Sequence, residues 1–95
     1  MKLKEARKLF NELRIQGKIV LTDHVINDHK ERLFTIVEIY QLIQHTKGKL
    51  SDNNRFPTST KGSFLYECKD DLNRDVQAAV VLKDNVIVIH IFRKV

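Results

Sequence analysis

The pattern of apolar positions predicts mostly helices before about residue 48 and strands after it. In residues 2–15, apolar residues recur at spacings of three and four and therefore line one face of a helix. The residues of this face are Leu3, Ala6, Leu9, Phe10 and Leu13. Gly17 follows at the place where a helix commonly ends in a left-handed cap, so we expect the helix to end there.

A short strand and a short helix are predicted next. Residues 18–22 (KIVLT) are rich in β-branched side chains and contain no breaker, which is typical of a strand. Thr22 or Asp23 can then cap a helix from His24 to about Arg32, because both residue types accept a hydrogen bond from the first helical turn.

This short helix is expected to present one charged face and one apolar face. His24, Asp28 and Arg32 follow at i,i+4 spacing and share a face, either as part of a working surface or as ordinary solvated groups. The residues expected to face inward are Val25, Ile26, His29 and Leu33.

The start of the next helix carries the most specific local signal. Thr35 and Glu38 fit the capping-box pattern T-x-x-E, and Phe34 and Ile39 are spaced as a hydrophobic staple requires. We expect the helix to run to about residue 45. Its apolar stripe is expected to consist of Ile36, Ile39, Tyr40 and Ile43, which assigns Tyr40 to the core.

From about residue 49 the pattern changes to strands. Residues 61–69 alternate, and residues 76–82 and 86–93 form two apolar strands joined at Asp84 and Asn85, residue types that tolerate tight hairpin turns. One side of the first of these strands carries Phe64, Tyr66 and Cys68. Loops are expected at residues 51–57 and 70–75.

A two-residue turn determines which residues of the last two strands share a face. The face expected to receive the helices carries Ala78, Val80, Leu82, Ile87, Ile89 and Ile91. The other face carries Gln77, Ala79, Val81, Val88, His90 and Phe92. His90 is then opposite Ala79, and Arg93 lies near the end of the core face. The prediction is an α+β fold in which two or three helices pack on one face of an antiparallel sheet.

The composition and net charge of the chain indicate which class of partner it could bind. The chain of 95 residues fits one domain, and its net charge of +5 permits an anionic partner such as nucleic acid. The basic face of residues 2–15 is either part of such a surface or a solvated cover over the core. We expect neither a signal peptide nor a membrane span, because the first ten residues are highly charged and no run of about 18 apolar residues occurs.

The single cysteine, Cys68, excludes an internal disulfide and favours a reducing compartment, so a cytoplasmic location is expected. Its place in the alternating strand favours a buried structural thiol over a nucleophile.

Motif spacing narrows the chemistry further. His24 and His29 are five residues apart rather than four, and no glycine-rich phosphate loop or serine nucleophile elbow is present, so we predict no metal and no cofactor. Histidine, arginine, lysine and tyrosine remain, and these suffice for metal-free RNA cleavage by a general base, a general acid and a cation on the phosphate. His24 as a helix-start residue and His90 as an ordinary strand histidine stay open as alternatives.

Several of these residues together resemble a known family. The matching stretches are IVLTDHV (19–25), Arg32, Phe34-Thr35, Glu38-Ile39 and the final IFRK (91–94). They resemble small bacterial domains of the RelE/ParE toxin-like superfamily. The resemblance covers about residues 18–95. We expect one domain, 1–95, in which residues 1–17 are an added N-terminal helix, residues 18–48 a strand and helices, and residues 49–95 the antiparallel sheet.

The resemblance implies a RelE/ParE-like fold. In the family pattern, His24 matches the histidine, Arg32 the arginine before the second helix, and Arg93 the arginine that closes the last strand. The family often has a further arginine one turn after the histidine, where this chain has Asp28, so one phosphate-binding cation is missing. The superfamily includes ribonucleases, gyrase poisons and proteins without known activity.

Three functions follow as hypotheses. The first is a toxin-like, metal-independent endoribonuclease acting on RNA phosphodiesters, with RNA or the ribosome as partner, His24, His90 and Arg93 catalytic, and Arg32 and Tyr66 binding substrate. The second is a non-enzymatic module that binds an acidic antitoxin or nucleic acid. The third is a structural domain in which these residues are capping and surface groups.

Overall fold

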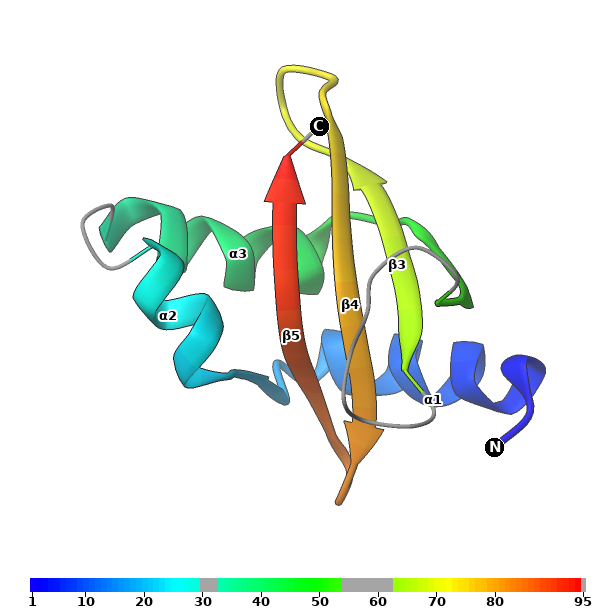
Figure 1. Cartoon of the computed structure of the whole chain (residues 1–95). Coiled ribbons are helices and arrows are strands. Elements are labelled where there is room, and N and C mark those ends of the chain that lie inside the picture. The colour runs from blue at the N-terminus through cyan, green and yellow to red at the C-terminus, as the bar shows by residue number, and fades with distance from the viewer. Residues whose placement is uncertain (30–32, 54–62, 95) are drawn as a thin grey trace.

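The computed structural model describes residues 1–29, 33–53 and 63–94, with residues 29, 33 and 34 described by their backbone only. The elements in chain order are α1 (Leu3–Ile15), β1 (Ile19–Leu21), α2 (Asp23–His29), α3 (Leu33–His45), β2 (Lys49–Asp52), β3 (Phe64–Lys69), β4 (Asp75–Lys83) and β5 (Val86–Lys94) (Figure 1). The α+β class predicted from the sequence is confirmed. No helix in the described ranges has the length and apolar character needed to cross a membrane.

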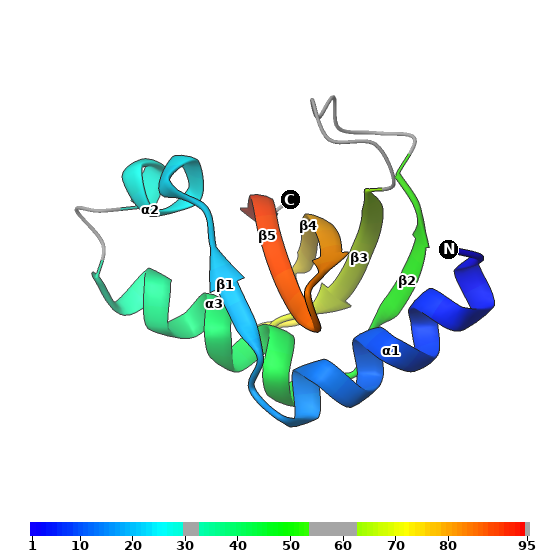
Figure 2. The ribbon, with the colours of Figure 1, turned by 90° about the horizontal axis from the view of Figure 1, so that it is seen from below.

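The strands form one sheet in the order β1-β5-β4-β3-β2. Every neighbouring pair is antiparallel except β1 and β5, which run parallel and pair Ile19 with Ile87 and Leu21 with Ile89. The expected sheet was wholly antiparallel, so the parallel edge strand is a correction. α1 and α3 cover one face of the sheet, and α2 lies beside β1 and β5 (Figure 2).

The core is formed by the inner face of the sheet and the apolar faces of the helices. α1 buries Ala6, Phe10 and Leu13, with Leu3 and Leu9 partly buried against the same cluster, as predicted. Each fully buried Phe, Leu or Ile contributes about 1.5–3 kcal/mol, so this face holds α1 to the sheet. Gly17 ends the helix with φ of 71°, which confirms the predicted left-handed cap.

α3 begins earlier than expected. It starts at Leu33, so Thr35 lies inside the helix and is buried, and the carboxylate of Glu38 pairs with Lys94 on β5. The predicted capping box is therefore wrong, because a residue within the helix cannot cap it and a distant cation holds the Glu38 side chain. The Phe34 side chain of the predicted staple lies outside the described residues.

The apolar stripe of α3 also differs by one position. Ile39 and Ile43 are fully buried, as predicted, and Ile36 packs against the core, but Tyr40 is 37% exposed whereas Leu42 is buried. Successive helical residues are about 100° apart, so the stripe centred on Ile39 includes Leu42 and leaves Tyr40 at its margin. The assignment of Tyr40 to the core is wrong.

In α2, Thr22 is the cap of the two candidates, because its hydroxyl accepts a hydrogen bond from the Val25 N–H (3.4 Å) and Asp23 is already helical. Val25 is buried as expected, but Ile26 is 38% exposed, so its predicted inward direction is wrong. The side chains of His29 and Leu33 lie outside the described residues.

The β3 alternation and the loop over residues 70–75 are confirmed, and Phe64, Tyr66 and Cys68 all face the core. The predicted start of the loop over residues 51–57 is two residues too early, since Ser51 and Asp52 belong to β2 and pair with β3. Residues 54–57 of that loop lie outside the described residues.

The hairpin between β4 and β5 turns at Asp84 and Asn85, with φ of 53° and 58°, as the residue types predicted. From the turn to the pair Val80–Ile89 the register keeps the predicted faces. Beyond that pair the register shifts, because Ala79 pairs with Ile91 and His90 is an extra residue in β5.

This β-bulge exchanges the faces of the residues that follow it. Phe92 enters the core and is buried, whereas Ile91 and Arg93 lie on the face that α1 and α3 do not cover. We call it the open face with respect to these two helices only, since Gln77, Ala79 and Val81 of β4 are buried there. The predicted pairing of His90 with Ala79 and the predicted faces of Ile91, Phe92 and Arg93 are therefore wrong. One added residue reverses all later positions, since side chains alternate with period two.

Gly48 provides a test of the packing between β2 and β3. A Cβ at this position would lie 2.3 Å from the Glu67 carbonyl oxygen, so Gly48→Ala requires the backbone to move. We expect it to lower the free energy of unfolding by about 2–3 kcal/mol in urea titrations.

Gly17→Ala is the matched control. It strains a left-handed backbone but meets only the Gln44 side chain, at 3.2 Å, and should cost about 1–2 kcal/mol. A Gly48→Ala protein as stable as the control would contradict the close approach.

Candidate functional site

The candidate site lies where β5 passes the start of α2. β1 pairs with β5 only as far as Ile89, and the Thr22 N–H donates to the Ile89 carbonyl oxygen (3.2 Å). His90 follows directly, in the bulge, and His24 lies two residues after Thr22. The backbones of His24 and His90 are therefore brought together, although the two residues are far apart in the sequence.

His24 stands in the first turn of α2 and points to a carboxylate. Its Nε2 lies 3.3 Å from Asp28 Oδ2, and the two side chains are 69% and 59% exposed. An exposed pair of this kind contributes at most about 1 kcal/mol to stability. Its chemical consequence is that Asp28 orients the ring and leaves Nδ1 of His24 directed away from the pair.

Arg93 is the end of a row of polar residues across the open face. The register aligns Arg93 with Gln77, Gln77 with Glu67, and Glu67 with Lys49. The Gln77 side-chain amide donates to Glu67 Oε2 (3.2 Å). No sequence pattern marked this row as a unit. The alternation in β3 predicts that Glu67 and Tyr66 lie on different faces of the sheet. The bulge that brings Arg93 beside Gln77 could not be predicted, because it lies in a run of apolar residues that gives no signal of it.

Tyr66 is placed away from these residues. It lies on the core face of β3, is buried, packs on Phe10 with ring centroids 4.6 Å apart, and donates its hydroxyl to the Thr46 carbonyl. Burial raises the pKa of Tyr66 to about 12. It shares no surface with Arg93, and Arg32 lies outside the described residues, so the substrate-binding roles of both stay predictions.

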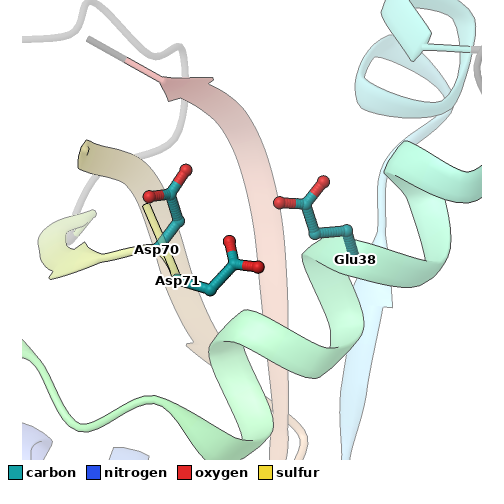
Figure 3. A group of neighbouring side chains, drawn as sticks. All are labelled: Glu38, Asp70 and Asp71. Carbon is teal, nitrogen blue, oxygen red and sulfur yellow. The ribbon is translucent and has the colours of Figure 1, made fainter. Parts of the chain in front are cut away.

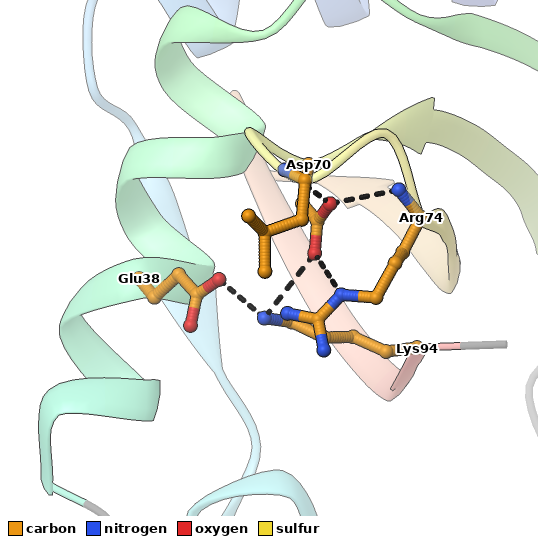
Figure 4. A network of polar contacts seen from close by, with 5 residues as sticks. Glu38, Asp70, Arg74 and Lys94 are labelled. Carbon is orange, nitrogen blue, oxygen red and sulfur yellow. Dashed lines mark hydrogen bonds and ion pairs between the residues drawn. The ribbon is translucent and has the colours of Figure 1, made fainter.

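Three carboxylates gather between α3 and the β3–β4 turn (Figure 3). Oxygens of Glu38, Asp70 and Asp71 lie within 4.8 Å of one another (Figure 3). Lys94 pairs with both Glu38 and Asp70, and Arg74 pairs with Asp70 at 2.8 Å (Figure 4). A metal ion would have to displace Lys94 from these oxygens, so the cluster is best described as an ion-pair network.

Asp70 is the centre of that network. Its side chain is fully buried and its Oδ1 accepts hydrogen bonds from the backbone N–H groups of Leu72 (2.9 Å) and Arg74 (2.8 Å). Its Oδ2 accepts from Arg74 Nε and lies 3.7 Å from Lys94 Nζ. These bonds close the β3–β4 turn and connect it to β5 and, through Glu38, to α3.

Comparisons of the chain with protein-family models, with curated proteins and with solved structures find no match. The function is therefore inferred from the geometry of the site.

The Cys68 thiol is buried, as predicted for a structural cysteine, and burial together with the charge of Asp70 raises its pKa to about 11. Only the thiolate reacts readily, so iodoacetamide should modify the folded protein far more slowly than the urea-unfolded protein at pH 7.5. Mass spectrometry over time measures both rates. Equal rates would show that the thiol is accessible.

Asp70 should make stability depend on pH in the acid range. The Arg74 N–H, the Arg74 guanidinium and the Leu72 N–H hold the pKa of Asp70 below its ordinary value of 3.8. A lowered folded-state pKa stabilises the fold above pH 3.8, and this contribution is lost as the pH falls through the folded-state pKa. Urea unfolding from pH 6 to pH 2 should therefore show a shallower loss in Asp70→Asn, which is already less stable at pH 6.

Asp71→Asn is the matched control, because it removes a neighbouring carboxylate that makes none of the Asp70 hydrogen bonds. The role assigned to Asp70 would be refuted if both variants followed the wild-type pH profile.

Proposed function

We propose that the protein is a toxin-like, metal-independent endoribonuclease of the RelE/ParE kind that acts in the cytoplasm. The observation that carries the proposal is the bulge at His90. It takes this histidine out of the regular ladder beside the start of α2, where His24 stands, and turns Arg93 onto the open face. Bulges are common next to active sites because they redirect a side chain.

The chemistry assigns one role to each residue. One histidine takes the proton of the ribose 2′-hydroxyl as general base, and the other protonates the leaving 5′-oxygen. Arg93 stabilises the charge that develops on the phosphate. His90 and Arg93 are three residues apart, about 10 Å along an extended strand, so the long arginine side chain has to reach back toward the histidines.

The order of elements supports the family proposal. A strand that ends at Leu21 leads through Thr22 and His24 into a short helix, then a longer helix, and the antiparallel strands end in Phe92-Arg93. This order agrees with the pattern on which the resemblance rests. Tyr66 is left out of the proposed site because its hydroxyl is engaged in the core.

A non-enzymatic binding module is the second candidate, and the His24–Asp28 pair favours it. The carboxylate reduces the positive charge at the place where a phosphate would have to bind. RNA binding that weakens steeply with salt and yields no cleavage product would support this function.

RNA cleavage tests the first proposal. The protein should cleave a labelled single-stranded RNA, or mRNA on ribosomes, with EDTA present. Either His24→Ala or His90→Ala should reduce the rate about a hundredfold or more, and Arg93→Ala should do the same. A rate equal to wild type in the His24→Ala/Arg93→Ala double variant would exclude this site.

His45→Ala is the matched control. His45 is an exposed histidine in the last turn of α3, beside Glu38 and Asp70 rather than beside β1. Its removal should leave cleavage unchanged, and thermal unfolding of each variant verifies that the fold is retained.

A further inference from the structure

A small pocket between α1 and the start of β2 is lined by four cations. Its volume is about 210 Å³. Arg7 and Arg14 line it from α1, and Lys47 and Lys49 line it from the other side. No carboxylate is found among its lining residues in the described part of the chain. The pocket is therefore strongly positive.

The two arginines are held in place by neutral oxygen atoms. Arg7 Nε donates to the Leu50 carbonyl (2.8 Å), and Arg14 donates through Nη1 to the Gln44 carbonyl (3.0 Å) and through Nε to Asn11 Oδ1 (3.0 Å). A carbonyl or amide oxygen fixes a guanidinium without neutralising its charge. Each guanidinium has five N–H donors, so both retain donors for a ligand.

None of the four cations is paired with a carboxylate within residues 1–29, 33–53 and 63–94. Three cations elsewhere in the described fold, Lys69, Arg74 and Lys94, each pair with an acid. Like charges around one small volume repel each other, and an anion that enters it relieves this repulsion.

Two aromatic rings are among the lining of the pocket. Phe10 and Tyr66 contact each other with their rings tilted by 38° and their centroids 4.6 Å apart, and the Tyr66 hydroxyl is already engaged with Thr46. Gly48 passes so close to Tyr66 that no side chain fits there, and its two neighbours, Lys47 and Lys49, both line the pocket. Asn11 adds a neutral amide beside Arg14.

The size of the pocket decides the class of ligand. Pockets that enclose a whole drug-sized ligand have about 300–1,000 Å³, so 210 Å³ suits a single small anionic group. Arginine forks match the oxygens of a phosphate, and lysines add point charge.

We propose that this pocket binds a phosphate group, with Arg7 and Arg14 as the directional contacts and Lys47 and Lys49 completing the charge. The pocket lies at the β2 edge of the sheet, whereas His24 and His90 lie toward the β1 edge. The proposal stands independently of RNA cleavage.

Titration with inorganic phosphate at constant ionic strength, followed by NMR chemical shifts or calorimetry, tests the proposal. The wild type should bind saturably, and Arg7→Gln/Arg14→Gln should bind about tenfold more weakly or worse. Because Arg7 also anchors α1, Lys47→Gln/Lys49→Gln provides a second variant that breaks no hydrogen bond in the described structure. It should weaken binding to a similar degree.

Lys4→Gln/Lys8→Gln is the matched control, since it removes two exposed cations from the same helix outside the pocket. It should change binding less than about twofold. Loss of binding equal to that of the pocket variants, or no saturable binding by the wild type, would overturn the proposal.

Two further probes identify the source of the phosphate. Tighter binding of a single-stranded oligoribonucleotide than of inorganic phosphate, with the same variant ranking, indicates a nucleic-acid backbone. Binding of adenosine monophosphate and inorganic phosphate, but not of the oligoribonucleotide, indicates a small phosphorylated molecule.

Discussion

The extra residue in β5 determines what each face of the sheet presents beyond it. Without it, Arg93 would belong to the core series and Phe92 to the open face. With it, an aromatic ring completes the core and a cation joins the polar row on the open face. The burial of Phe92 thus stabilises the same local distortion that takes His90 out of the regular ladder and turns Arg93 onto the open face. Packing and the candidate chemistry depend on one irregularity of the backbone.

The charges of the chain are arranged unequally. Buried or partly buried acids are matched with cations, as in the contacts of Asp70 with Arg74 and Lys94, which connect a turn, a strand and a helix. The two arginines of the α1–β2 pocket are instead held by carbonyl and amide oxygens. The first arrangement stabilises the fold, because a buried carboxylate without such partners is costly. The second leaves a positive potential at the surface, which is a property for binding and not for stability.

Local signals predicted the fold well where a residue type favours one particular backbone conformation. Gly17, Asp84 and Asn85 were assigned correctly because left-handed backbone conformations favour glycine, asparagine and aspartate. The apolar face of α1 was also evident, since the polar residues between its apolar positions make the helical spacing of three and four recognisable. In β5 the run around Ile89 to Phe92 is nearly all apolar apart from His90, so alternation carries no mark of a bulge.

Long-range contacts explain the remaining differences. Glu38 fits a capping box locally, but Lys94, far away in the sequence, holds its carboxylate. Tyr40 and Leu42 are both apolar enough for a core stripe, and only the position of the sheet selects between them. The candidate site was predicted in residue type but not in arrangement. The pairing of β1 with β5 brings the backbone before His24 next to the backbone before His90, whereas Tyr66 lies on the core face of the sheet.

The parallel pairing of β1 with β5 has a consequence for how the chain acquires its structure. β5 lies between β1 and β4, yet it is the last of the described elements to be synthesised. Contacts between segments so distant in sequence slow folding, because a large loop must close before they form. During translation, β1 and the start of α2 therefore lack their partner until β5 has left the ribosome. A chain whose β5 segment is still inside the ribosome cannot bring the backbones of His24 and His90 together.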